Sequence, residues 1–505
     1  MAALAPSIPI AVVGAGTMGA GIAQVAASAG HTVLIHDSRA EATARALQSV
    51  ALALERASAK GRISRDDAAG IVGRLVRSDD LAMLSPAGLV IEAVSEDMAV
   101  KTAILVELER LVAADAILVS NTSSLSITAL GSALERPERL VGMHFFNPAP
   151  VMPLVEVISG LATDRAVAER TFDTAAAWGK SPVHVKSTPG FLANRVARPF
   201  YGEALRTLEE GAADIATIDA VMRESGGFPM GPFELIDLVG VDVNWAVTNA
   251  VHDAYFQDTR FKPFLIQGEL VAAGRLGRKS GRGFYHHGTG AERPLPRSAP
   301  EAPAPVRVTL EGDLGPAQPL VQRIELAGIP VRRLPGEGAL VIEGARLALT
   351  DGRSATERAA AAGVPGLVLF DLVLDYGAVG RLAVAAADQA PPTATAAAAG
   401  LFHALRVVPS PVDDIPGLIV MRTVAMLANF AADAVHNGIA DAQGVDTAMR
   451  KGMNYRRGPL AWAEAIGLPL VVRVLDNLAR AYGEERYRAS PLLRRRAAAG
   501  ARFHG

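Results

Sequence analysis

Short apolar runs alternate with helix-like stretches over the first part of the chain. The first run extends from Ile8 to Val13 and stops at a glycine, and the second extends from His31 to Asp37. Later runs cover residues 88–93, 116–121 and 140–146. Short apolar strands separated by helical patterns are typical of a parallel sheet that is covered on both faces. The pattern therefore predicts a doubly wound α/β domain over residues 1–187.

The pattern changes after this domain. From Pro189 to about Gly240 the apolar spacing becomes helical, which predicts an all-α domain over residues 188–286. Residues 287–306 are rich in Pro, Ala and charge, a composition typical of a linker. Strand-like runs at 338–342 and 366–371 predict a small, degenerate α/β domain over residues 307–408. The alanine run 396–399 within it fits either a helix or low complexity.

The last segment, 409–495, repeats the helical domain. Pro416-Gly417-Leu418 matches Pro189-Gly190-Phe191 at an offset of 227 positions, and Gly458-Pro459 matches Gly231-Pro232 at the same offset. One polar position differs, because Asn194 becomes Met421. A constant offset indicates an internal duplication. We expect the second copy to keep the fold and to have lost the chemistry.

Composition excludes several classes of function. The 505 residues carry 50 basic and 52 acidic side chains and 5% aromatics, which argues against a broad nucleic-acid surface. Cysteine is absent, which excludes disulfides, thiolate zinc sites and a cysteine nucleophile. No metal-ligand cluster is expected, and His286 and His287, beside the linker, are expected to face solvent.

Neither a membrane span nor a signal peptide is predicted. Residues 8–31 carry no charged side chain, but they are rich in Ala and Gly rather than Leu. A buried strand, a turn and a packed helix explain this stretch better than a membrane span. The first residues have no basic segment, so no signal peptide is expected and a cytoplasmic location is compatible.

A glycine-rich turn connects the first strand to the first helix. Its sequence is Gly14-Ala15-Gly16-Thr17-Met18-Gly19, the pattern of a Rossmann-type dinucleotide turn. Asp37 ends the second strand, where an acid binds the ribose 2′-hydroxyl and repels a 2′-phosphate. NAD is therefore favoured, although the neighbouring Arg39 keeps NADP open. A glycine turn without any ligand is the remaining alternative.

Two further segments carry candidate chemistry. Residues 120–124, Ser-Asn-Thr-Ser-Ser, follow a strand where open α/β sheets bind ligands, although polar residues are common there. His144 and Glu156 lie on two apolar strands joined by the turn 147–150, so the strands can place them opposite each other. A carboxylate on one imidazole nitrogen makes the other a general base. A purely structural pair stays equally open.

Together these motifs resemble the L-3-hydroxyacyl-CoA dehydrogenase family over residues 8–285. The resemblance also rests on Glu92 to Lys101, on residues 144–148 and 189–195, and on residues 277–281. The extension with its repeated helical domain resembles the longer bacterial members, which often act on 3-hydroxybutyryl-CoA or in phenylacetate breakdown, where the substrate is 3-hydroxyadipyl-CoA.

The resemblance implies roles for matching residues. His144 is the expected base and Glu156 its partner, while Ser123 and Asn194 are expected to hold the substrate oxygen. Lys60 is a weaker match to a basic residue that meets coenzyme A, and Ala53 stands near the position of a coenzyme A-contacting serine in some relatives. The expected NAD site comprises Gly14, Gly16, Thr17, Met18, Gly19, Asp37, Glu96, Lys101, Asn121, Asn147 and Lys279.

The expected activity is NAD-dependent oxidation of an L-3-hydroxyacyl-CoA to the 3-ketoacyl-CoA. A homodimer or an internal pseudo-dimer through the helical domains is expected, with no nucleic-acid or membrane partner. Two alternatives stay open: a dehydrogenase of a free hydroxyacid, and a non-catalytic NAD-binding protein. Asn194-Arg195 does not supply the catalytic lysine of simple hydroxyacid dehydrogenases, and sugar-nucleotide dehydrogenases need a cysteine that is absent here.

Overall fold

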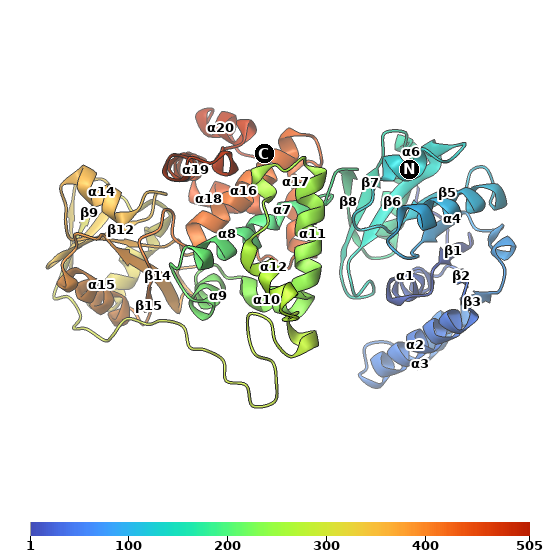
Figure 1. The fold of residues 1–505 in the computed structure, drawn as a ribbon, viewed down its shortest axis with the longest axis horizontal. Helices are drawn as coiled ribbons and strands as arrows, with labels where there is room; N and C mark the ends of the chain where they lie inside the picture. Colours follow the sequence, from blue (N-terminus) through green and yellow to red (C-terminus); the bar gives the residue numbers. More distant parts are fainter. Residues whose placement is uncertain (1) are drawn as a thin grey trace. The chain divides into compact units, whose positions relative to one another are not determined.

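A computed structural model describes residues 2–505, which form two compact units. The first unit contains residues 2–195 together with Asn437–Met453, and the second contains Val196–His436 and Asn454–Gly505. Figure 1 shows the chain as a ribbon and labels helices and strands where there is room. Among the residues described, no helix is both long enough and apolar enough to cross a bilayer.

The first unit is built on an eight-stranded sheet with the order β3-β2-β1-β4-β5-β6-β7-β8. All neighbours from β3 to β6 run parallel, β7 is antiparallel to β6, and β8 is parallel to β7. The reversal at β7 follows from the short connection after β6, because a parallel neighbour requires a longer crossover. The strands are β1 Ile10–Val13, β2 Val33–His36, β3 Leu75–Ser78, β4 Leu89–Glu92, β5 Ile117–Ser120, β6 Leu140–Phe145, β7 Leu154–Ser159 and β8 Ser181–Lys186.

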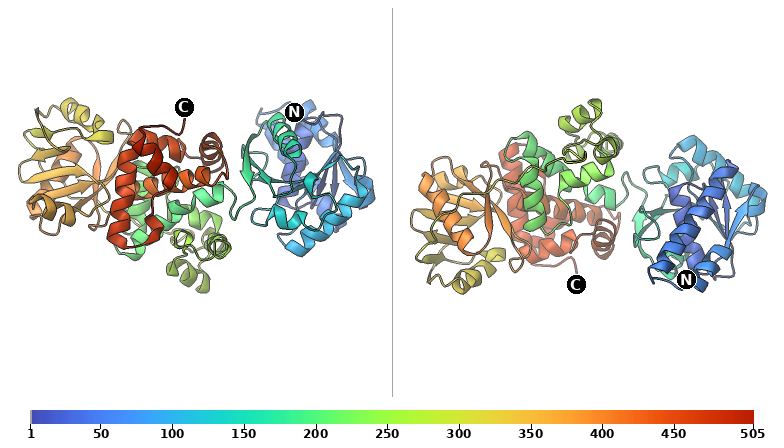
Figure 2. Two further views of the ribbon diagram at one scale, coloured as in Figure 1. Left: turned by 90° about the horizontal axis from the view of Figure 1, so that it is seen from above. Right: turned by 90° about the horizontal axis from the view of Figure 1, so that it is seen from below.

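Helices lie on either side of this sheet (Figure 2). Strands β1, β4 and β5 are buried at every position, so both faces of the sheet are covered and the predicted doubly wound class is confirmed. Ser64, Asp97 and Ser126 each accept a backbone N–H three residues on, which starts three of the helices. The helices are α1 Thr17–Ser28, α2 Ala40–Ala59, α3 Arg65–Gly73, α4 Met98–Leu111, α5 Ile127–Gly131, α6 Arg165–Ala177, α7 Ala193–Val196 and α17 Ala442–Gly452.

The second unit combines helices from both copies of the repeat with a seven-stranded mixed sheet. The first copy supplies α8 Arg198–Glu209, α9 Ile215–Glu224, α10 Pro232–Val239, α11 Val241–Ala254 and α12 Leu265–Ala272, with the 3₁₀ turn η3 Thr259–Phe261. The second copy supplies α16 Val420–His436, α18 Pro459–Ile466, α19 Leu468–Tyr482, η6 Glu485–Tyr487 and α20 Pro491–Ala498.

The seven-stranded sheet has the order β10-β9-β11-β12-β13-β14-β15. Its strands are β9 Val308–Glu311, β10 Val331–Leu334, β11 Ala339–Ile342, β12 Ala345–Leu349, β13 Leu367–Phe370, β14 Arg381–Ala386 and β15 Val408–Pro411. Three helices pack with it: α13 Pro319–Leu326, α14 Ala355–Ala362 and α15 Pro392–Ala404. The alanine run 396–399 lies inside α15, so the helical alternative is the correct one.

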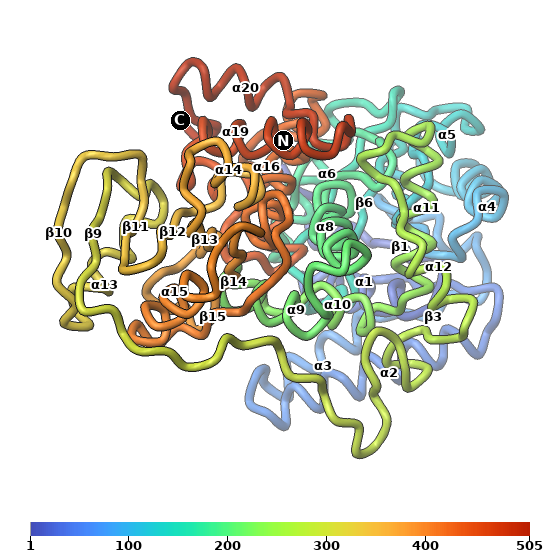
Figure 3. The backbone as a smooth tube through the Cα atoms, turned by 60° about the vertical axis from the view of Figure 1, so that its left-hand side comes forward, coloured from blue at the N-terminus to red at the C-terminus, as the bar shows by residue number. Residues whose placement is uncertain are grey.

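The Pro- and Ala-rich segment 287–306 contains no helix or strand but is fastened to the second unit (Figure 3). The Arg297 N–H donates to the Thr217 hydroxyl at 2.8 Å, and the Ala299 N–H donates to the Pro409 carbonyl at 2.8 Å. The segment is therefore an extended strap rather than a free tether.

The internal duplication extends well beyond the motifs that reveal it. Strand β14 begins and ends 227 positions after β7, and α15 does the same relative to α6. Strand β13 starts 227 positions after β6, and α16 spans the positions equivalent to α7 and α8. Even the turn is repeated, since Gly190 and Phe191 have positive φ, as do Gly417 and Leu418. The repeated unit therefore includes the last three strands of each sheet as well as the helices.

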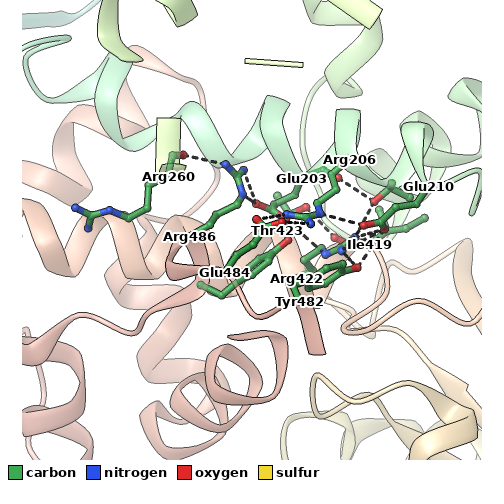
Figure 4. Close-up of polar contacts among 12 residues, drawn as sticks. Glu203, Arg206, Glu210, Arg260, Ile419, Arg422, Thr423, Tyr482, Glu484 and Arg486 are labelled. Carbon is green, nitrogen blue, oxygen red and sulfur yellow. Dashed lines mark hydrogen bonds and ion pairs between the residues drawn. The ribbon is translucent and has the colours of Figure 1, made fainter. Parts of the chain in front are cut away.

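Charged side chains, rather than only apolar ones, join the two helical copies where α8 packs against α16 (Figure 4). Glu203 is fully buried and accepts hydrogen bonds from Arg486 at 2.7 Å and from the Tyr487 hydroxyl at 2.9 Å. Arg206 forms an ion pair with Glu484 at 2.7 Å. Each of these contacts joins the first copy to the second.

Candidate active site

The glycine-rich turn leaves an opening at the start of α1. Gly14 has φ +104°, and a Cβ there would lie 2.5 Å from the Ala93 carbonyl oxygen. A Cβ on Gly19 would overlap the Gly14 carbonyl, so both positions require glycine for the backbone to pack. Gly16 is different: it is exposed, and a Cβ there would meet nothing within 4 Å. Because no side chain caps α1, its N-terminal N–H groups fit a dinucleotide pyrophosphate.

Asp37 stands next to this opening, just after β2. Its carboxylate accepts the Ala15 N–H at 2.9 Å and the Arg39 N–H at 2.9 Å. Burial opposes ionisation, but these hydrogen bonds and the Arg39 side chain outweigh it and lower the pKa of Asp37. Asp37 is therefore a charged acceptor suited to a ribose hydroxyl, and it holds Arg39 in place.

A buried ion pair lies behind the turn, at the end of β4. The Lys101 ammonium is 2.7 Å from the Glu92 carboxylate and 3.3 Å from that of Glu96, and its side chain is only 1% exposed. The Ser120 hydroxyl donates to Glu92 at 2.7 Å. Glu92 is a functional candidate that was not predicted from the sequence. The available signal was a carboxylate closing an apolar strand nine residues before a lysine.

Glu96 organises the serine-rich loop. One of its oxygens accepts the Ser123 N–H at 2.8 Å, the Ser123 hydroxyl at 3.1 Å and the Thr122 hydroxyl at 2.7 Å. Burial opposes ionisation of Glu96, but these hydrogen bonds and the nearby Lys101 lower its pKa. The Ser123 hydroxyl therefore has a defined position at the mouth of the loop.

His144 and Glu156 face each other across two antiparallel strands. They are register partners on β6 and β7, and His144 Nδ1 is 2.6 Å from Glu156 Oε2. The second Glu156 oxygen accepts the N–H groups of Leu192 and Ala193 at 3.1 and 2.8 Å. Both side chains are buried, and the Phe191 ring packs near the imidazole. With Nδ1 donating to the carboxylate, Nε2 is left as the basic nitrogen.

Several other candidate residues are placed close to this dyad. Asn194 lies in the first turn of α7, directly after the N–H groups that Glu156 holds. Asn121 accepts the Phe145 N–H at 3.0 Å, which connects the ends of β5 and β6. Because β1, β4, β5 and β6 run parallel, the glycine turn, the serine loop and His144 share one edge of the sheet.

The remaining candidates are surface residues or belong to the second unit. Lys60 is exposed directly after the end of α2, and Asn147 is exposed in the turn after β6. Lys279 lies in the second unit, where it pairs with Asp242 at 2.7 Å. The expectation that His287 faces solvent is wrong, because its Nε2 lies 2.8 Å from the buried Asp237 carboxylate and only 13% of its side chain is exposed.

The second copy of the repeat lacks the dyad. The position equivalent to His144 is Asp371, and the position equivalent to Glu156 is Ala383. Asp371 accepts the N–H groups of Ile419, Val420 and Met421, at the positions equivalent to 192–194. It therefore holds the start of α16 as Glu156 holds the start of α7, but it offers no imidazole.

Comparison with protein-family models identifies each part of the chain. The NAD binding domain of 3-hydroxyacyl-CoA dehydrogenase matches residues 9–188. Its C-terminal domain matches twice, at 190–287 and at 417–502. The reduced Rossmann-fold domain of 3-hydroxybutyryl-CoA dehydrogenase matches residues 347–416. The chain belongs to the 3-hydroxyacyl-CoA dehydrogenase family. The predicted NAD cofactor, dehydrogenase class and acyl-CoA substrate class are confirmed by this membership.

Relatives of two lengths are similar to the chain. A 3-hydroxyadipyl-CoA dehydrogenase from Escherichia coli is 43% identical over 489 residues, 97% of each chain. A probable 3-hydroxybutyryl-CoA dehydrogenase from Bacillus subtilis is 41% identical over 278 residues, which cover 55% of this chain and 96% of its own. The crystal structure of a 3-hydroxybutyryl-CoA dehydrogenase from Escherichia coli matches 98% of this chain and 99% of its own, with a TM-score of 0.90 and 42% identity.

Proposed function

We propose that this dehydrogenase oxidises an L-3-hydroxyacyl-CoA to the 3-ketoacyl-CoA with His144 as the general base. One observation carries the assignment: the buried His144 and Glu156 are 2.6 Å apart, and Glu156 is also fastened to the start of α7. Nothing in the packing of two apolar strands requires a buried histidine and carboxylate, whereas alcohol oxidation requires a base of this kind.

The chemistry follows from the positions of these groups. When bound, NAD supplies the acceptor for the hydride that leaves the alcohol carbon. His144 Nε2 takes the hydroxyl proton, and Glu156 stabilises the imidazolium that forms. Ser123 and Asn194 donate hydrogen bonds to the substrate oxygen, which gains negative charge in the transition state. To do so, the Ser123 hydroxyl exchanges Glu96 for the substrate.

The cofactor-binding assignments follow the same edge of the sheet. The start of α1, with the exposed Thr17 and the half-buried Met18, receives the pyrophosphate, and Asp37 receives the adenosine ribose. Glu96, Lys101, Asn121 and Asn147 complete the part of the proposed NAD site that the first unit supplies. The assignment of Lys279 to NAD stays a prediction. Lys60, an exposed cation, is assigned to coenzyme A.

The substrate assignment rests on the relatives. The full-length relatives carry the names 3-hydroxyadipyl-CoA and 3-hydroxybutyryl-CoA dehydrogenase, so these two esters are the candidate substrates. We assign the chain to fatty-acid or phenylacetate catabolism in the cytoplasm. The contacts between α8 and α16 support an internal pseudo-dimer of the two helical copies.

Replacing the base tests this proposal. His144→Asn keeps an N–H donor for Glu156 but removes the basic nitrogen, so we expect kcat to fall by about 10²- to 10⁴-fold, the usual contribution of a general base. The dissociation constant for NAD, measured by titration of the NADH-free enzyme, should stay unchanged. A variant that turns over at the wild-type rate would remove His144 from the mechanism.

A further inference from the structure

The second copy of the repeat contributes a helix to the NAD-binding unit. Helix α17 packs against β7 and β8, and the segment Asn437–Met453 that contains it belongs to the same compact unit as the eight-stranded sheet. The flanking helices of that copy, α16 and α18, belong to the second unit. In the second unit the converse occurs, because α9 of the first copy packs against β14 (Figure 3).

Equivalent residues make the two contacts. The Lys186 N–H at the end of β8 donates to the Ile439 carbonyl at 2.9 Å. In the second unit the Asp413 N–H donates to the Ala212 carbonyl at 3.0 Å. Each residue of one pair lies 227 positions from its equivalent in the other pair. The last strands of each sheet are therefore covered by the helical copy of the opposite repeat.

A second pair of contacts follows the same relation. Gly452 of α17 packs on Leu154 of β7, and a Cβ on Gly452 would overlap the end of the Leu154 side chain. At the equivalent positions the Ser225 hydroxyl donates to the Arg381 carbonyl at 2.5 Å. The absence of a side chain at Gly452 thus lets α17 approach β7 closely.

The contact at Gly452 lies beside the proposed catalytic strand. Leu154 precedes Glu156 by two residues on β7, so the two side chains point to the same face of the sheet. A shift of β7 would move the carboxylate that holds both His144 and the start of α7. The equivalent contact in the second repeat carries no such chemistry, because Ala383 stands where Glu156 would be.

We propose that Asn437–Met453 is a positioning element for β7, supplied to the active site by the second repeat. In this chain the strands β7 and β8 are covered by α17, which comes from the second helical copy. The second copy therefore acts in catalysis without contributing a group that touches substrate. This inference rests on the proposed role of the His144–Glu156 dyad.

A bulky residue at the seam tests the proposal in the full-length protein. Gly452→Val should push α17 away from β7 and lower kcat by about 10- to 100-fold, because displacements on the order of 1 Å have effects of this size. The dissociation constant for NAD should not change, since β4, β5 and β6 separate β1 from β7. Adding Leu154→Ala to this variant removes the overlap and should restore kcat.

The duplication provides a matched control. Ser225→Val introduces the same side chain at the equivalent seam, so we expect a lower melting temperature but a wild-type kcat. Hydrogen exchange of residues 181–187, which include the Lys186 N–H, should accelerate in Gly452→Val and not in Ser225→Val. If Gly452→Val yields no soluble protein, Gly452→Ala places the same Cβ against Leu154 and is measured instead.

The outcomes separate this inference from the proposed function. A wild-type kcat in the Gly452 variants, equal losses in the Gly452 and Ser225 variants, or no recovery with Leu154→Ala would each overturn the positioning role. If His144→Asn is inactive while Gly452→Val is fully active, only the role of α17 fails. If His144→Asn remains active, the catalytic assignment itself fails.

Discussion

The Asp37 side chain makes two contacts, one through each of its carboxylate oxygens. One oxygen fixes the glycine turn through Ala15, and the other fixes Arg39. Because its pKa is lowered, the carboxylate remains charged at neutral pH and repels a 2′-phosphate. We therefore propose that preference for NAD over NADP depends on this one charge.

A charge-neutral variant isolates that effect. Asp37→Asn keeps an oxygen for the Ala15 N–H but loses the negative charge and releases Arg39 to meet a phosphate. We expect the ratio of kcat/KM for NAD to that for NADP to fall by at least about tenfold, the equivalent of 1.4 kcal/mol. Steady-state kinetics with both cofactors measure it. An unchanged ratio would show that the discrimination lies elsewhere.

Some contacts of the candidate site residues could be predicted from the sequence, and others could not. The pairing of His144 with Glu156 was predictable, because a short turn joins their strands and antiparallel neighbours face each other. The burial of Lys101 was not, because its partners Glu92 and Ser120 come from two strands that only the folded sheet brings together. Local patterns identify an element, whereas a contact between distant elements depends on the whole fold.

At the scale of elements, a buried carboxylate holds the start of one helix in each repeat. Glu156 accepts N–H groups at the start of α7, and Asp371 accepts them at the start of α16. Glu156 also holds an imidazole, and Asp371 itself occupies the position equivalent to that imidazole. In the second repeat a carboxylate thus still holds the start of a helix, but no imidazole accompanies it.

Neutralising each carboxylate should reveal this difference. Glu156→Gln should lower kcat strongly, because the imidazolium of His144 loses its counter-charge. Asp371→Asn should lower the melting temperature and leave kcat at the wild-type value. Activity assays measure kcat of both variants, and thermal melts measure their stability. A large loss of kcat in Asp371→Asn would mean that the second repeat retains a catalytic task.

The pH dependence of stability follows from the same carboxyl group. Burial raises the pKa of Asp371 from 3.8 to about 6. Between these values the folded protein binds more protons than the unfolded chain, so this group's contribution to stability falls as the pH rises. The Asp371→Asn variant lacks this pH-dependent contribution to stability. The difference in melting temperature between wild type and variant should therefore shrink as the pH is raised from 4 to 7, and a widening difference would contradict the assignment.

At the scale of the whole molecule, the two copies of the duplicated helical domain differ in their charges. The helical copies are equivalent in their element boundaries but not in their charges, since Arg206 of α8 corresponds to Asp433 of α16. Arg206 pairs with Glu484, whereas Asp433 pairs with Arg260. This helix position is therefore a cation in the first copy and an anion in the second, and each pairs with an opposite charge of the other copy. This complementarity favours pairing of the first copy with the second.

Reversing one charge tests this complementarity. Glu484→Arg places a cation beside Arg206 and near Arg486, so we expect a lower melting temperature that partly recovers at high salt. The neighbouring exposed Glu485 provides the control, because Glu485→Arg makes the same change of net charge. Equal effects of the two variants would show that the ion pair between the copies is unimportant.

The duplication was visible in the sequence only within the helical domain, where glycines, prolines and a few charged residues match at one offset. The match of β13–β15 to β6–β8 was not predicted, because strands with the same apolar character share few identical residues. The packing of α17 in the NAD-binding unit also could not be predicted from the sequence. A helical pattern predicts which face of a helix is buried, but it does not name the surface that buries it.

The proposed dehydrogenase activity is tested most directly by the initial rate of NADH formation by the wild-type enzyme with two esters, L-3-hydroxybutyryl-CoA and 3-hydroxyadipyl-CoA. Free 3-hydroxybutyrate serves as the control substrate. We predict NADH formation with at least one ester at a kcat/KM well above that for the free acid. No rate with either ester in an enzyme that binds NAD, or a preference for the free acid, would contradict it.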